Sequence, residues 1–237
     1  MLQRVAEVMP TREYATFAQL CTACSAAASG ALQVVVATEV AKRMGVGEKV
    51  GDGICQKCPD LVLPDSVTQI GDGVFQGCSS LTSVVLPAAL GSVGDWAFAG
   101  CTSLTSAVLP ALLTSIGSGA FCNCKNLNSI ALPASLTKIG FNAFERCEAL
   151  TAITIPDSVV SIKRATFLNC TALAFVSLPA NLTTVEQRAF INCTALKSIT
   201  MPGRRVIDIQ RDAFFRCVAL GAPHRECIRA ICPGAVF

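Results

Sequence analysis

Cysteine is the residue type with the most chemistry to offer in this sequence, because fourteen of the 237 residues are cysteines. Thiolates bind zinc, and paired thiols form disulfides. Seven cysteines recur at a regular spacing: Cys78, Cys101, Cys124, Cys147, Cys170, Cys193 and Cys217. If they stack in register, their parallel side chains stay about 4.8 Å apart and do not converge to the roughly 3.8 Å between Cβ atoms that a disulfide requires. We therefore predict a ladder of buried, inert, reduced thiols, with Cys58 as an eighth candidate member.

Two Cys-x-x-Cys pairs, Cys21 with Cys24 and Cys55 with Cys58, offer an alternative use of four thiols as zinc ligands. Thirty residues separate the two pairs, which is wider than the spacing in common zinc modules. Cys21 and Cys24 also fall in a segment that we expect to be helical. We therefore predict no metal site.

The other reactive side chains are scattered. Cys122 lies outside the ladder and could be exposed, and Cys227 and Cys232 could form a bridge in an oxidising compartment. His224 is the only histidine, and we expect it at the surface of an irregular tail. A hydrolase triad or a histidine-based metal site would need further groups beside it. No phosphate loop, dinucleotide fingerprint or paired-carboxylate motif occurs, so we expect neither catalysis nor a cofactor.

A 23-residue repeat must position the cysteines, because other residue types share their spacing. Prolines stand at 64, 87, 110, 133, 156, 179 and 202, and phenylalanines at 75, 98, 121, 144, 167 and 190. A further unit with one inserted residue supplies Phe214, Cys217 and Leu220. Such a period indicates stacked units that bury their apolar residues jointly. We predict a solenoid over residues 45–220.

Each unit has a simple internal pattern. The alternation of Ile130 and Leu132 predicts a short strand with one buried face, and the next proline ends the pairing because it has no N–H group. Glycines at 71, 94, 117 and 140 are expected to permit a turn. We predict one short parallel strand in each coil, with helix largely confined to residues 1–44.

The unit sequences LPASLTKIGFNAFERC and IPDSVVSIKRATFLNC resemble the BspA-type leucine-rich repeat over about two thirds of the chain. The resemblance implies a β-rich, right-handed solenoid with short parallel strands on its concave face. Members of the family serve in adhesion and protein binding, in secreted, surface and intracellular settings. The chain departs from the pattern where Lys163, Glu186 and Gln210 replace the turn glycine.

The two ends differ from the repeat. Residues 1–44 form either a helical N-terminal cap or a degenerate F-box, which RVAEVMPTREYATFAQLCTAC resembles at Met9-Pro10, Arg12-Glu13 and Leu20-Cys21. The leading proline-containing segment and the later arginine-x-tryptophan of an F-box are missing. An F-box would imply a Skp-type adaptor as partner and a role in a cullin ubiquitin ligase. Residues 221–237 are expected to form a C-terminal cap.

Composition narrows the class of protein. With 52% hydrophobic and 15% charged residues, the chain can bury a large core. A net charge of +3 gives no global signal for nucleic acid, although residues 157–237 hold ten Lys or Arg against five Asp or Glu. We expect no membrane span and a cytoplasmic protein. A secreted or cell-surface adhesin is the alternative, because sequons begin at Asn169, Asn181 and Asn192.

The outward strand positions are the expected binding surface of such a solenoid, and none of the twelve is charged. They are Ser83, Val85, Ser106, Val108, Ser129, Ala131, Ala152, Thr154, Phe175, Ser177, Ser198 and Thr200. Phe175 is the one bulky anchor, and Arg164, Arg188 and Arg211 could steer an acidic partner. We predict a non-enzymatic interaction scaffold whose protein partner contacts Ser129, Ala152, Thr154, Phe175, Ser177, Ser198 and Thr200.

Overall fold

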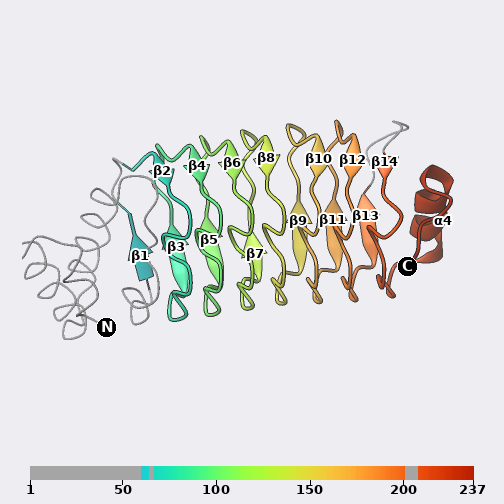
Figure 1. Ribbon diagram of the computed structural model, residues 1–237, viewed down its shortest axis with the longest axis horizontal. Helices are drawn as coiled ribbons and strands as arrows, with labels where there is room; N and C mark the ends of the chain where they lie inside the picture. The colour runs from blue at the N-terminus through green and yellow to red at the C-terminus, as the bar shows by residue number, and fades with distance from the viewer. Residues whose placement is uncertain (1–59, 64–66, 201–207) are drawn as a thin grey trace, which may run out of the picture.

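The computed structural model describes residues 60–63, 67–200 and 208–237, in which the chain winds into coils stacked along one axis (Figure 1). A single helix within this part, α4 (Ala222–Ile231), closes the C-terminal end. The predicted N-terminal cap, the F-box resemblance and the zinc pairs fall on residues 1–59, outside the described residues.

One row of parallel strands runs along the solenoid, as the alternating pattern predicts. Each strand pairs in register with its counterpart one repeat away, for example Val84 with Ala107. The row consists of β1 (Asp60–Val62), β3 (Ser83–Val85), β5 (Ser106–Val108), β7 (Ser129–Ile130), β9 (Ala152–Thr154), β11 (Phe175–Ser177) and β13 (Ser198–Thr200).

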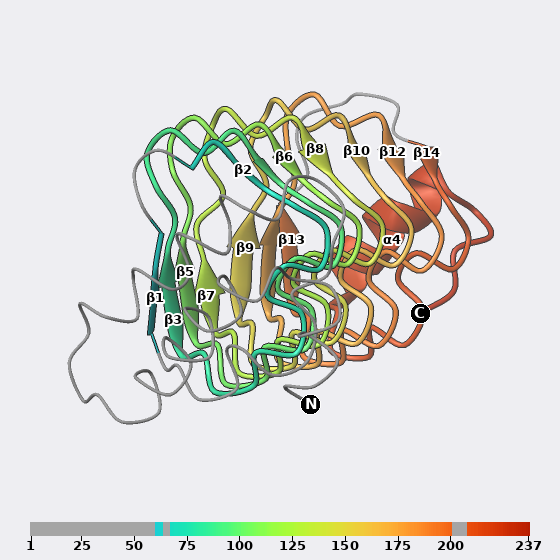
Figure 2. The same ribbon diagram turned by 60° about the vertical axis from the view of Figure 1, so that its left-hand side comes forward.

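A second row of strands was not predicted, and the expectation of one strand per coil is wrong. These strands lie on another side of each coil (Figure 2). Each is two residues long, and its second residue is buried, as Ile116 is. They are β2 (Gln69–Ile70), β4 (Ser92–Val93), β6 (Ser115–Ile116), β8 (Lys138–Ile139), β10 (Ser161–Ile162), β12 (Thr184–Val185) and β14 (Asp208–Ile209).

The core is a set of columns in which each side chain packs on its equivalent in the next coil. Seven phenylalanine rings, from Phe75 to Phe214, stack with centroids 5.1 to 5.6 Å apart. Columns of leucine and cysteine lie beside them, also buried. Because offset-stacked rings attract one another beyond their burial, this column ties every coil to both neighbours.

Two columns in the turns hold left-handed backbone. One contains Gly77, Gly100, Asn123 and their counterparts up to Arg216, all at φ between 57° and 77°. The other contains Gly73, Trp96, Gly119, Asn142, Ala165 and Arg188. The glycines at 71, 94, 117 and 140 are not left-handed, so the expected turn role was wrong. They provide space instead, because a Cβ at Gly94 would lie 2.7 Å from the carbonyl carbon of Gly71.

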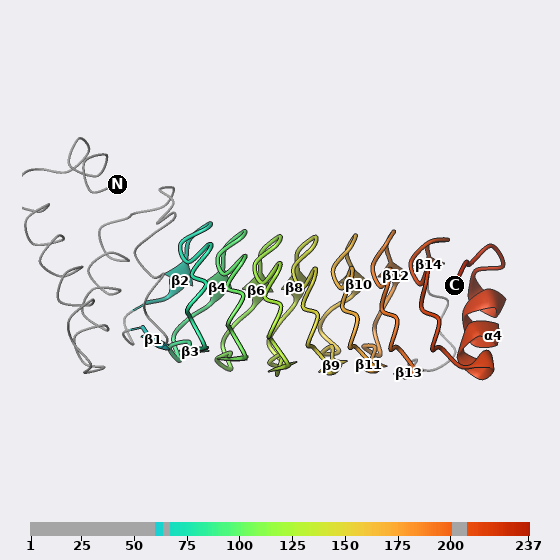
Figure 3. The same cartoon turned by 90° about the horizontal axis from the view of Figure 1, so that it is seen from below.

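Both rows of strands are interrupted at the same place, between the fourth and fifth coils. The sheets are β1-β3-β5-β7 and β9-β11-β13 in the first row, and β2-β4-β6-β8 and β10-β12-β14 in the second. Gly140 N donates to Ile116 O (2.9 Å) and Glu186 N to Ile162 O (2.9 Å), but the described residues show no such bond from Lys163 N to Ile139 O. The step between β8 and β10 is visibly wide in Figures 1 and 3. On the turn side the coils stay linked, since Phe144 N donates to Thr166 O (2.9 Å).

The interruption coincides with the end of the glycine column. Gly140 is its last member and Lys163 is the first residue there with a side chain. A Cβ at Gly140 would already fall 2.6 Å from the carbonyl carbon of Gly117, so coils stacked in this way leave no room for one. The later coils use another contact, in which Glu186 Oε2 accepts from Arg164 N (3.0 Å). Two stacks of different construction therefore meet at Lys163.

Within the described residues, no helix is both long and apolar enough to span a bilayer.

Replacing Phe144 by alanine should lower the free energy of unfolding by about 3–5 kcal/mol, the usual range for emptying a buried phenylalanine site. Phe144 is fully buried between Phe121 and Phe167. Phe141→Ala is the matched control, since that ring is 48% exposed in the same coil and should cost less than about 1 kcal/mol. Urea denaturation measures both, and equal losses would contradict the stacked-core description.

Replacing Lys163 by glycine should let the fifth coil approach the fourth and protect the amide of residue 163. One net hydrogen bond of about 1 kcal/mol corresponds to roughly fivefold slower hydrogen exchange. Lys163→Ala removes the ion pair with Glu186 but keeps the Cβ, so its exchange should stay fast. Glu186→Gly, placed where pairing already exists, should bring no gain. Equal exchange in Lys163→Gly and Lys163→Ala would show that side-chain bulk is not the cause.

Candidate interaction surfaces

The outer face of the first strand row carries the predicted binding residues. All twelve outward positions are at least partly exposed, and their inward neighbours, such as Val84 and Ile153, are buried. The alternation in each strand therefore sets this orientation. None of these twelve positions is charged, and their apolar members are small except for Phe175, Val85 and Val108. The register partner of Ser83 in β1 is Asp60, an acidic residue at the N-terminal end of the row.

Phe175 stands alone on its part of this face. Its ring is 56% exposed, and its partners in register on the two flanking strands are Ala152 and Ser198. Ser177, two residues along the same strand, also points outward and is partly buried. The ring therefore projects from a flat surround of small side chains. Ser129 lies one coil beyond Ala152, and thus two coils from Phe175, across the interruption between β7 and β9.

The three arginines expected to steer a partner do not border this face. Arg164, Arg188 and Arg211 follow β10, β12 and β14, so the second row of strands separates them from Phe175. Arg188 also pairs with Asp212, with 3.8 Å between Nε and Oδ2. Arg164 and Arg211 are exposed. Their charges therefore act on a different side of the solenoid.

The cysteine column forms a reduced ladder with a hydrogen bond that the sequence did not reveal. Each thiol from Cys101 onward donates to a phenylalanine carbonyl of the preceding coil, as Cys147 does to Phe121 O (3.3 Å). The six bonds span 3.1 to 3.3 Å between sulfur and oxygen. This direction aims each thiol at a backbone oxygen, and all ladder cysteines are free. The thiols thus act as small core residues that also join coils.

Burial makes four of these thiols weaker acids. It raises the pKa of Cys124, Cys147, Cys170 and Cys193 well above the ordinary value of 9.0, chiefly because a thiolate would lose its solvation. Burial, with the nearby Glu145, also raises the pKa of Cys122 to about 11. Cys122 is only partly exposed, so the expected exposed thiol is not a reactive one.

The remaining candidates for chemistry stay isolated. Cys227 is exposed and Cys232 partly exposed, and both are free. His224 lies in α4 rather than in an irregular tail, half-buried, with Nε2 3.4 Å from Ser198 Oγ. No carboxylate accompanies this pair in the described residues, and His224 Nδ1 is buried without a partner. The described part of the chain also holds no cluster of three or more potential metal ligands.

Two sequon asparagines take part in a ladder of their own. Asn192 Nδ2 donates to Asn169 Oδ1 (2.7 Å), and both residues belong to the left-handed column beside the cysteines. Their side chains therefore serve to join coils. Asn181, the third sequon position, is exposed.

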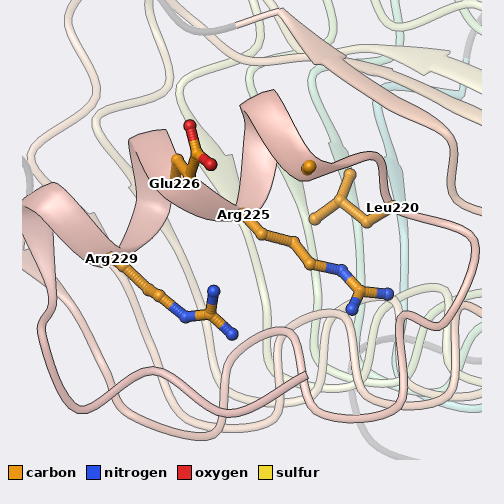
Figure 4. Close-up of a pocket in the computed structure, with 5 residues that line it drawn as sticks. Leu220, Arg225, Glu226 and Arg229 are labelled. Atoms are coloured by element: carbon orange, nitrogen blue, oxygen red, sulfur yellow. The ribbon is translucent and has the colours of Figure 1, made fainter.

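Helix α4 covers the open end of the last coil. Ile228 of this helix is buried against the last coil. The Arg225 guanidinium donates to Val218 O (2.7 Å), a carbonyl of the last coil that has no following coil to pair with. Figure 4 shows Arg225 and Arg229 on one side of the helix and Glu226 on the other. These residues and Leu220 line a hollow of about 390 Å³. Both guanidinium groups also lie over the Phe237 ring, at 5.6 and 5.1 Å from its centroid. The hollow is therefore part of the end cap.

The free energy of unfolding should fall as the pH rises above about 9, because the thiols of Cys124, Cys147, Cys170 and Cys193 ionise in the unfolded chain and stay protonated in the folded one. Each such thiol contributes a slope of about 1.4 kcal/mol per pH unit above its unfolded pKa. Cys147→Ala should make this slope shallower by about 1.4 kcal/mol per pH unit. Phe141→Ala, which removes an exposed side chain that does not ionise, should leave the slope unchanged. Urea titrations between pH 8 and 11 measure the slopes, and identical slopes for both variants and the parent chain would contradict a buried neutral ladder.

Comparison with known proteins agrees with this architecture. The T. pallidum leucine-rich-repeat protein is 29% identical, with a TM-score of 0.69, and the match covers 76% of this chain and 87% of that one. A leucine-rich-repeat protein from Bacteroides ovatus is 34% identical, with a TM-score of 0.60, over 62% of this chain and 38% of that longer chain. No curated protein matches.

The family comparison agrees with the repeat resemblance and gives no support to the F-box resemblance of residues 1–44. The model of the BspA type leucine-rich-repeat region matches six copies of the repeat, over residues 49–112 and 91–221. These ranges include every coil that the structure describes. The chain belongs to the BspA-type leucine-rich-repeat family.

Proposed function

We propose that this protein is a non-enzymatic interaction scaffold that binds a protein partner through the outer face of the first strand row around Phe175. The observation that carries the proposal is the exposure of this ring, at 56%, in the midst of small side chains. Exposed aromatic rings that a partner can enclose supply much of the binding energy at protein interfaces. A strand surface in a solenoid also offers the long, regular area that such binding uses.

The chemistry of the face favours a protein over other ligands. Nucleic acids are held largely through arginine and lysine contacts to phosphates, and none of the twelve outward positions is charged. These twelve positions also offer no acid, base or thiol for catalysis. Serine and threonine hydroxyls, as at Ser198 and Thr200, form hydrogen bonds without projecting far from the sheet. Shape and a single apolar anchor therefore determine what fits.

The family assignment supports the scaffold part of the proposal. In a stacked solenoid each coil depends on its neighbours for its core, so surface positions can vary while the stack persists. Here the core columns of phenylalanine, leucine and cysteine are uniform, whereas the outward position of Phe175 holds serine or alanine in five other coils. That variation sits on the surface, where it changes binding rather than folding.

Phe175→Ser should weaken partner binding by about 2 kcal/mol or more, or roughly thirtyfold in Kd. Partners captured by the parent chain are identified by mass spectrometry and then titrated as purified proteins. Val160→Ser is the control, because that side chain is 50% exposed and lies away from the first strand row. Unchanged affinity together with a lower free energy of unfolding would make Phe175 a structural residue and refute the proposed site.

A further inference from the structure

Trp96 is the least expected residue on the surface. It is the only tryptophan of the chain, it adopts a left-handed φ of 57°, and its side chain is 44% exposed. A bulky residue adopts this conformation less readily than glycine, which occupies the same position in the coils on either side. Five other residues of this column, among them Asn142 and Ala165, share the conformation, so stacking requires it and only the large exposed ring is peculiar to Trp96.

The Trp96 ring lies flat against the next coil. A Cβ atom added to Gly119 would fall 2.5 Å from Trp96 Cε3, so the absence of a side chain at Gly119 makes room for the ring. Gly119 N donates to Phe141 O (2.7 Å), which places Phe141 on the following coil beside this site. Phe141 is 48% exposed. Two exposed aromatic rings therefore occupy one turn edge of three successive coils.

Two carboxylates lie in the same turn as Trp96, on its own coil and on the preceding one. Asp95 precedes Trp96 and accepts from Ser118 N (2.6 Å), and Asp72 on the preceding coil accepts from Asp95 N (2.7 Å). Each bond uses Oδ1 of a carboxylate on an exposed residue. The sequence between Lys57 and Lys125 contains four aspartates and no lysine, arginine or histidine. In the coil after Phe141, the equivalent position is occupied by the exposed Arg164. The acidic end of this edge is therefore the end at Trp96.

We propose that Trp96, Phe141, Asp72 and Asp95 form a second docking surface, which binds an arginine or lysine side chain in a basic segment of a partner protein. An indole face attracts a cation through its quadrupole, and arginine is the cation most often found there. The neighbouring carboxylates add charge attraction and direct the cation to the ring. In each coil this surface comes just after the strand of the second row, whereas Phe175 lies in the first row. The proposal therefore does not depend on the scaffold function proposed above.

The experiment uses the full chain and a fluorescein-labelled hexa-arginine peptide. Binding is followed by anisotropy of the label and, with unlabelled peptide, by the emission of Trp96, which reports on this site alone because the chain has no other tryptophan. We expect hexa-arginine to change the tryptophan emission and hexa-glutamate to leave it unchanged. The affinity should fall as salt is raised, since the exposed charges are screened over about 10 Å at 0.1 M.

Matched variants separate the ring and the local charges from general attraction. Trp96→Asn should fold, because Asn142 has the same φ of 57° in the same column, and should weaken hexa-arginine binding about two- to fivefold. Asp95→Asn keeps an acceptor for Ser118 N and should also weaken binding. Asp157→Asn is its control, because Asp157 Oδ1 accepts from Ala180 N (2.7 Å) in the same manner, away from the aromatic pair.

Three results would overturn the proposal. The first is that Trp96→Asn binds hexa-arginine as tightly as the parent chain does, and the second is that Asp95→Asn and Asp157→Asn lose the same amount of affinity. The third is that the peptide binds without any change in the tryptophan emission. Phe175→Ser should bind hexa-arginine normally. The two proposals are therefore tested independently, because a result that contradicts one leaves the other unaffected.

Discussion

The in-register stacking of each residue on its equivalent one repeat away is the constraint from which the other features of the fold follow. A single 23-residue unit has too little apolar surface to form a core, and its rings and leucines are covered only when another unit lies on each side. The phenylalanine stack joins successive coils through packing, and the thiol-to-carbonyl bonds join them through polar contacts. Register is fixed because a shift of one residue would turn the apolar positions outward.

Stacking also dictates what the turns can contain. Two positions in each described coil before the last, and one in the last, have left-handed backbone, which glycine and asparagine adopt most easily, yet Arg146 and Trp96 are also found there. Close approach of the backbones requires glycine in a third column, through Gly140. Where that column ends, the strands of the two adjoining coils no longer pair. Small differences at a repeated position thus have effects on a whole side of the solenoid.

The sequence predicted those features that repeat with a strong apolar or cysteine signal. The solenoid, the buried cysteine column and the outward direction of Phe175 all follow from the 23-residue spacing. The second row of strands gave no such signal, because a strand as short as Ser115–Ile116 has one inward residue and no alternation to detect. Left-handed backbone at Trp96 and the interruption at Lys163 depend on distances between coils, which a linear pattern does not contain. The identity of a partner likewise depends on a surface outside this chain.

The interruption between β8 and β10 has a mechanical consequence. Load applied along the axis of a stacked array is carried in series, so every junction bears the whole force. The junction between these two coils lacks strand pairing on two of its sides. It is held by fewer backbone bonds than the others, such as Phe144 N to Thr166 O, together with the Phe144–Phe167 stack and the bonds from Ser158 Oγ to Ala134 O and Leu136 O. Under tension the array would part there first, and each of the two halves would keep its own paired sheets intact.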